Sequence, residues 1–201
     1  MNSYDIKYVK NTPDWASIPV INIENRYLET PDDITACAQI CYSVDAFLVH
    51  LSTVEKEIRA VEKGLVGAPC EDSCLEFFFC PMENEIRYLN FEVNINGCMF
   101  IGLGTGIDDL TRLVVENPEK FFKHSISKTD DGWEIFYEIP YSFIRRFFPD
   151  FEVKPGKAMR ANCFKCADFS NPPHYMSWNP VEGEPFTFHK PNCFGVMNFT
   201  E

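Results

Sequence analysis

The sequence predicts an all-β protein, an antiparallel β-sandwich of jelly-roll type with one short helix. The chain is a series of short alternating or aromatic-rich runs separated by turn residues, which is typical of such folds. Apolar residues make up 45% of the 201 residues, enough for a sizeable core. We find no repeat, low-complexity tract or linker, so we expect residues 1–201 to form a single domain.

In the first half, strands are expected at 36–41 and 46–53, joined by the turn at 43–45. A polar segment at 55–63 follows, as a loop or a short helix. Three more strands are expected at 73–80, 85–95 and 98–103. Asn96 and Gly97 separate the last two, and this dipeptide is a strong signal for a tight hairpin turn.

In the second half, strands at 122–128 and 133–139 flank a Thr-Asp-Asp-Gly turn. Phenylalanines at helical spacing in 140–148 predict the short helix, which Pro149 ends. A strand is expected at 158–166 and a last one at 193–199. The proline-rich stretch between these two strands is expected to be loop.

The net charge limits the classes of binding partner, and the cysteine content indicates the cellular compartment. The net charge of −12 argues against nucleic acid and against an anionic membrane surface as partners. The start of the chain has no basic and apolar leader, and no apolar run approaches the roughly 20 residues that cross a bilayer. With an odd number of cysteines, nine, we expect a reduced, cytoplasmic protein. An extracellular location stays open if a leader was removed.

Alternation along the strands predicts one apolar and one polar face of the sheet. Apolar side chains such as Leu75, Phe77, Leu89 and Phe91 are expected in the core. The opposite face carries carboxylates, carboxamides and a guanidinium, which match the paired hydroxyls of a sugar ring. The hydrogen-bonding candidates are Glu76, Glu92, Asn94, Arg160 and Asn162. The alternative is an ordinary solvated face of an antiparallel sheet.

A sugar site also needs an apolar platform, for which Trp178 is the candidate. It lies in a proline-bounded segment at 172–180, beside the last polar strand. The alternative is a core Trp that closes one end of the sandwich. Trp133, at the start of a strand, and Trp15 are assigned to the core.

Several segments resemble family 9 carbohydrate-binding modules, and more specifically the divergent family 9-like proteins of bacteria. The residues that carry the resemblance are EDSCLEFF at 71–78, YLNFEVN at 88–94, RANCFKC at 160–166, PHYMSWNP at 173–180 and FHKPNCFG at 188–195. The resemblance extends from about residue 35 to the end of the chain. It implies a β-sandwich that binds glucan or xylan ends, or free sugars, without cutting them.

In that family two Trp side chains sandwich the sugar, and acidic, amide and basic residues hydrogen-bond it. Trp178 matches the second Trp, and Glu71 and Asp72 belong to the motif that follows the first. The first Trp position is occupied here by Cys70. Binding is then weaker, or is assisted by another aromatic residue such as Tyr175, or has been lost.

The resemblance also implies structural calcium, for which no Asp-rich loop of recognisable spacing is present. It implies a partner glycosidase as well, which would here be a separate protein. No other cofactor is expected.

The sequence also allows three further hypotheses. Cys163, Cys166, His189 and Cys193 could hold zinc, but their wide separation and the strand position of Cys163 favour no zinc site. Glu76 and Glu92 share the polar face and could act as a glycosidase pair. We favour hydrogen bonding to a sugar, since neither residue is distinguished as a general acid. A protein-interaction domain with a decayed sugar site is the third, and it predicts a buried Trp178.

Overall fold

The computed structural model describes all residues, 1–201, and is built mostly of β-strands. Its strands are β1 Ser3–Tyr8, β2 Ile21–Ile23, β3 Asn25–Tyr27, β4 Thr35–Tyr42, β5 Ala46–Val54, β6 Cys74–Cys80, β7 Tyr88–Asn94, β8 Met99–Gly104, β9 Thr111–Leu113, β10 Ser125–Lys128, β11 Gly132–Pro140, β12 Ala158–Ala167, β13 His174–Ser177 and β14 Gly195–Thr200. The α-helices are α1 Pro118–Phe121 and α2 Tyr141–Ile144, and the 3-10 turns are η1 Trp15–Ser17, η2 Pro69–Glu71 and η3 Pro191–Cys193.

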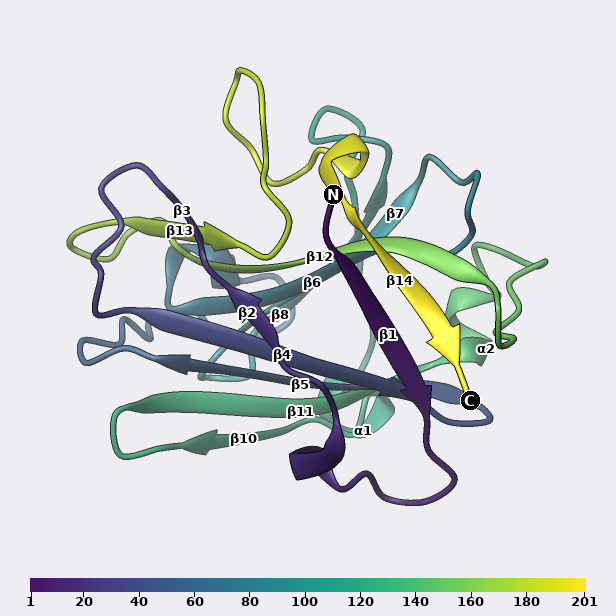
Figure 1. The fold of residues 1–201 in the computed structure, drawn as a ribbon. Helices are drawn as coiled ribbons and strands as arrows, with labels where there is room; N and C mark the ends of the chain where they lie inside the picture. The colour runs from purple at the N-terminus through teal and green to yellow at the C-terminus, as the bar shows by residue number, and fades with distance from the viewer.

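The strands form one mixed sheet that curls on itself. Its order is β10-β11-β5-β4-β1-β14-β12-β6-β7-β8-β9, with β2, β3 and β13 paired off this path. Figure 1 shows β1 and β14, the two ends of the chain, lying side by side between the two halves of the sheet. Because β1 runs parallel to both β14 and β4, the prediction of a purely antiparallel sheet is wrong at this junction.

The main core lies between the two halves of the sheet. Phe47 on β5 packs 5.7 Å from Phe79 on β6 and 5.9 Å from Phe199 on β14, ring centre to ring centre. The predicted core residues on β6 and β7 are all fully buried here. Trp133 is also buried, and its indole N–H donates to Ser73 Oγ over 2.8 Å. Trp15 is only half-buried, at the edge of the sheet beside His50.

The long strands with clear alternation match their predicted ranges closely, and α2 confirms the helix expected in 140–148. The short strands β1, β2, β3, β9 and β13 were not predicted. The segment assigned to loop around Trp178 contains β13, which pairs with β12 and β3. Each missed strand has six residues or fewer, too few for a periodic pattern to stand out. None of the helices has the length and apolar character needed to span a bilayer.

Candidate functional site

The side of β6, β7 and β12 that points away from the main core is also buried. Its apolar members Cys74, Phe78 and Phe164 form a second cluster. Phe188 and Phe194 contribute to this cluster from residues 178–194, the covering segment between β13 and β14. Figure 1 shows this segment, between β13 and β14, as a long loop that rises above β12 before it returns to β14. The predicted polar face is therefore covered by the protein's own chain, and water reaches only part of it.

A cavity of about 480 Å³ remains between this face and the covering segment. Its volume lies within the range of roughly 300–1,000 Å³ that is typical of small-ligand sites. The lining combines apolar and ionisable side chains from strands and loops on all sides: Leu28, Ala68, Pro69, Cys70, Glu76, Glu92, Phe100, Ile107, Leu110, Arg112, Cys166, Asp168, Tyr175, Phe186, Thr187, Phe188 and His189.

Two buried carboxyl groups lie together in this cavity. Glu76 on β6 and Glu92 on β7 are register partners, so their side chains emerge side by side. Glu76 Oε1 accepts a hydrogen bond from Cys166 Sγ at 2.9 Å, and Glu92 Oε1 accepts one from Asn90 Nδ2 at 2.6 Å. Glu76 Oε2 is buried and has no partner in the protein. A buried acceptor without a partner is costly unless a ligand or water satisfies it.

Burial raises the pKa of both carboxyl groups above the ordinary range. For Glu92 the neighbouring charge of Glu76 raises the pKa further, and for Glu76 the charge of Asp168 does so. Two close carboxyl groups in a poorly solvated site resist double ionisation. The pair therefore favours holding a proton, and can then donate as well as accept hydrogen bonds, as sugar hydroxyls also do.

Arg112 on β9 is the positively charged residue of the cavity. Its Nη1 and Nη2 donate to the carbonyls of Val66 and Gly67 at 3.1 and 2.6 Å, while its buried Nε has no partner. The guanidinium lies over the ring of Phe100 at 4.8 Å, which fixes its plane. Arg112 thus adds a fixed donor to the acceptors of Glu76 and Glu92.

The opposite wall is formed by Asp168, Tyr175 and aromatic rings of the covering segment. Burial raises the pKa of Asp168, while side-chain hydrogen bonds from Tyr175 and Cys70 lower it, with a net rise. The ring of Tyr175 packs 5.7 Å from Phe186 and 6.2 Å from Phe188. These rings give the cavity an apolar wall.

Trp178 is not part of the cavity. Its side chain is 7% exposed and belongs to the main core. A Cβ atom at Gly195 would lie 2.8 Å from the indole, so the glycine leaves the space that the ring fills. The expectation of an exposed platform at Trp178 is therefore wrong in this structure, because the ring closes the end of the core.

Asp72 and Asn94 lie outside the cavity and organise the segment before β6. Asp72 accepts from the backbone N–H groups of Val61 and Glu62 at 2.8 and 2.7 Å, and also from Arg59. Asn94 donates to Asp72 at 2.8 Å. Both side chains are fully buried and satisfied, so they shape the loop that ends at the cavity wall.

The remaining predicted residues also lie outside the cavity. Asn162 donates to Asn179 O at 2.9 Å and accepts from Asn179 N at 2.8 Å, which fixes the chain after Trp178. Arg160 donates to the carbonyls of Pro191 and Glu85, both at 2.8 Å. Glu71 lies on η2, where its carbonyl accepts from Phe169 N. Of the predicted site residues, only Glu76, Glu92 and Tyr175 line the cavity.

Sequence reasoning missed Arg112, Asp168 and the aromatic wall. Arg112 lies on a strand of only three residues, and nothing in the local sequence distinguishes it. Asp168 directly follows β12, at the end of the strand with the predicted polar residues, a position that could have suggested it. Phe188 was considered only as part of the family motif, and His189 also as a zinc ligand, although FxFH after a proline is unusually aromatic for a loop.

The cysteines and histidine considered for zinc do not converge. Cys163 belongs to the main core, whereas Cys166, three residues further along β12, belongs to the second cluster. His189 Nδ1 lies 2.7 Å from the hydroxyl of Tyr88. All nine cysteines are free thiols in the structure.

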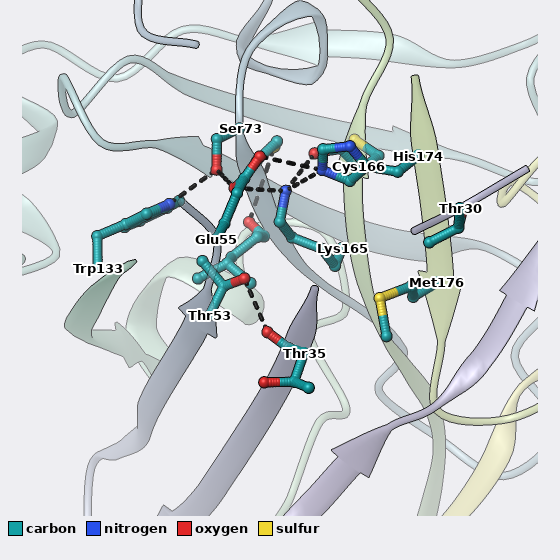
Figure 2. Close-up of polar contacts among 12 residues, drawn as sticks. Thr30, Thr35, Thr53, Glu55, Ser73, Trp133, Lys165, Cys166, His174 and Met176 are labelled. Carbon is teal, nitrogen blue, oxygen red and sulfur yellow. Dashed lines mark hydrogen bonds and ion pairs between the residues drawn. The ribbon is translucent and has the colours of Figure 1, made fainter. Parts of the chain in front are cut away.

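A second buried polar group lies at one end of the core, around Glu55 (Figure 2). Glu55 Oε2 is 3.1 Å from Lys165 Nζ, and Oε1 is 3.2 Å from His174 Nε2. Ser73 also donates to this carboxylate. Burial raises the pKa of Glu55, but His174, Lys165 and Ser73 together lower it to about 2. This carboxylate is ionised and paired, in contrast to Glu76.

The chain belongs to carbohydrate-binding family 9, whose model matches residues 3–199. It is similar to a putative carbohydrate-binding protein from Bacteroides uniformis, with 28% identity, a TM-score of 0.80 and 98% of each chain covered. No curated protein sequence matches it.

Two solved structures of a family 9 carbohydrate-binding module from Caldicellulosiruptor kristjanssonii share the fold. The complex with glucose has a TM-score of 0.71 at 12% identity, covering 99% of this chain and 96% of that one. The complex with cellotriose has a TM-score of 0.70 at 13% identity, covering 99% and 94%. At these identities the likeness establishes the fold alone.

Proposed function

We propose that the cavity at Glu76 and Glu92 binds a saccharide without cutting it. The observation that carries this proposal is the buried, unpartnered Glu76 Oε2 inside a cavity walled by aromatic rings. Hydroxyl groups would satisfy Glu76, Glu92 and Arg112 Nε, while the CH face of the ring would lie against Phe186 and Phe188. Membership of a carbohydrate-binding family, and neighbours solved with glucose and cellotriose, support the same ligand class.

The charges of the cavity favour a neutral sugar over an acidic one. Three carboxyl groups, Glu76, Glu92 and Asp168, share the space with the single cation Arg112. A uronic acid would add a further negative charge to a poorly solvated site, which is unfavourable. We therefore propose glucan or xylan oligosaccharides, or free neutral sugars, as ligands. Family and neighbours favour binding over the hydrolase hypothesis for Glu76 and Glu92.

Isothermal titration calorimetry with glucose, cellotriose and xylotriose tests the proposal, after a glycan-array screen. Glu76→Gln should weaken binding about fivefold or more, because leaving one partner of a buried hydrogen bond unsatisfied costs about 1–3 kcal/mol. Glu152→Gln, the same change at an exposed carboxylate, is the matched control and should bind as the wild type does.

One observation favours a second candidate, a protein-interaction domain with a decayed sugar site. Trp178 is buried, as that hypothesis predicts, and Cys70 occupies the position of the other expected Trp. The same experiment distinguishes the two candidate functions. If the wild type binds no saccharide in the screen or the titrations, the saccharide proposal is overturned and the interaction hypothesis is favoured.

A further inference from the structure

Two thiols and a carboxylate come together at the floor of the cavity. Cys74 on β6 and Cys166 on β12 are register partners, and Glu76 lies two residues after Cys74 on the same side of β6. The ligand atoms of these three residues all lie within 4.8 Å of one another. Cys166 Sγ and Glu76 Oε1 are already 2.9 Å apart.

The separations suit one metal ion held by all three groups. Tetrahedral zinc with bonds of about 2.0–2.3 Å places its ligand atoms roughly 3.5–3.8 Å apart. The cluster therefore needs only small side-chain rotations, with Glu76 moving slightly away from Cys166. The two thiols are on neighbouring strands of one sheet, so the backbone already holds them in place.

Access and charge also favour an ion at this point. Cys166 and Glu76 line the cavity, which gives an entry path, whereas Cys74 lies fully buried behind them. Glu76 Oε2 has no partner in the protein and is free to coordinate, and the hydrogen bond from Cys166 Sγ to Glu76 Oε1 is lost when the thiol proton leaves. The nearby cation Lys165 points to the other side of β12, where it pairs with Glu55. Glu92 and Asp168 are further acidic groups of the same cavity.

We propose that Cys74, Cys166 and Glu76 bind one thiophilic divalent cation of the zinc type, with a fourth position open to the cavity. Two thiolates select for such an ion over calcium or magnesium, which prefer oxygen ligands. As each metal–sulfur bond forms, the thiol proton passes to solvent, and no electron transfer is involved. This inference goes beyond saccharide binding and does not depend on it, although Glu76 takes part in both.

Titration of the reduced, metal-free full-length protein with Co²⁺ alone tests the site. Thiolate ligation produces near-ultraviolet charge-transfer bands, and the expected result is one Co²⁺ per chain, displaced by Zn²⁺. Cys74→Ala and Cys166→Ala should each reduce these bands, and the double variant should lose them. Losing even a group that supports a ligand weakens metal binding by about 10- to 100-fold, so each single variant should lose at least that much Zn²⁺ affinity.

Cys163→Ala is the matched control, a buried thiol on the same strand that faces the main core, and it should retain the bands. Absence of charge-transfer bands in the wild type, or bands that persist in the double variant, overturns the site. If the variants do not fold, wild-type crystals soaked in Zn²⁺ replace them. An anomalous peak between the two Sγ atoms then supports the site, and its absence there contradicts it.

The metal site and the saccharide site can be tested independently of each other. Sugar titrations are performed with chelator present, and Co²⁺ titrations without sugar. Metal binding without sugar binding overturns only the saccharide proposal, and sugar binding without metal binding overturns only the metal site.

Discussion

The two sides of β6, β7 and β12 are equally buried but chemically different. Toward the main core the strands present Leu75, Phe77, Leu89 and Phe91, and their apolar surface is fully packed. On the opposite side Glu76 is just as inaccessible, yet one of its oxygens has no partner and a cavity lies beside it. Complete packing stabilises the fold, whereas incomplete polar pairing leaves binding capacity for a ligand.

The largest loss of stability is expected from a substitution on the apolar side of these strands. Phe77→Ala should lower the free energy of unfolding by about 4 kcal/mol, because it removes a fully buried ring and leaves a cavity. Urea unfolding monitored by Trp fluorescence measures the change. The fraction that remains folded should bind sugar as tightly as the wild type does. A loss below 1 kcal/mol would contradict the assignment of Phe77 to the core.

A somewhat smaller effect is expected at Glu55, the buried carboxylate that is paired. Glu55→Gln should lower the free energy of unfolding by about 3 kcal/mol at neutral pH, because Lys165 loses the carboxylate that neutralises it. The variant also tests the comparison with Glu76, since Glu55 is paired with the cation Lys165 and Glu76 has no cationic partner.

The sign of the pH dependence follows from the pKa of Glu55. Its pKa is lowered to about 2 on folding, so its contribution is present above the ordinary value near 4.5 and is lost as the pH falls toward 2. Between pH 2 and 4.5, the free energy of unfolding should therefore fall more steeply with decreasing pH for the wild type than for Glu55→Gln. Urea unfolding at several pH values in this range measures the two slopes. Equal slopes would argue against a strongly paired carboxylate.

Trp178→Phe sharpens the distinction between core and cavity. We expect a loss of about 2 kcal/mol in stability, since a buried indole is replaced by a smaller ring beside Gly195. Sugar affinity measured by calorimetry should change less than about twofold, within the usual effect of a distant site. A selective loss of sugar binding at unchanged stability would instead restore Trp178 as the platform.

The smallest stability effect is expected on the polar side. Glu76→Gln should change the free energy of unfolding by no more than about 1 kcal/mol, because the wild-type carboxyl is incompletely paired in the folded protein. Thermal unfolding of both proteins without ligand measures this. A loss as large as that of Glu55→Gln would show that Glu76 is a structural residue and not one reserved for a ligand.

The sequence alone determined the long strands, the apolar face that each of them turns toward the core, and the family. Strands β4, β5, β6, β7, β11 and β12 alternate clearly, and alternation is a local property that the residues carry with them. It also placed Glu76 and Glu92 on one side of the sheet, because each alternates along its own strand with apolar residues that face the core. These two residues and Tyr175 are the part of the cavity that sequence reasoning found.

Only the tertiary structure decided what lies opposite that face. The parallel pairing of β1 joins residues at the two ends of the chain, and no local pattern encodes such a contact. The covering segment with Phe188 brings an aromatic wall over Glu76, and the same packing leaves Trp178 inside the core. Register, not spacing in the sequence, sets Cys74 beside Cys166. Whether a polar residue faces a cavity or is paired within the protein depends on these long-range neighbours. Asn94, Arg160 and Asn162 all hydrogen-bond within the protein and lie outside the cavity.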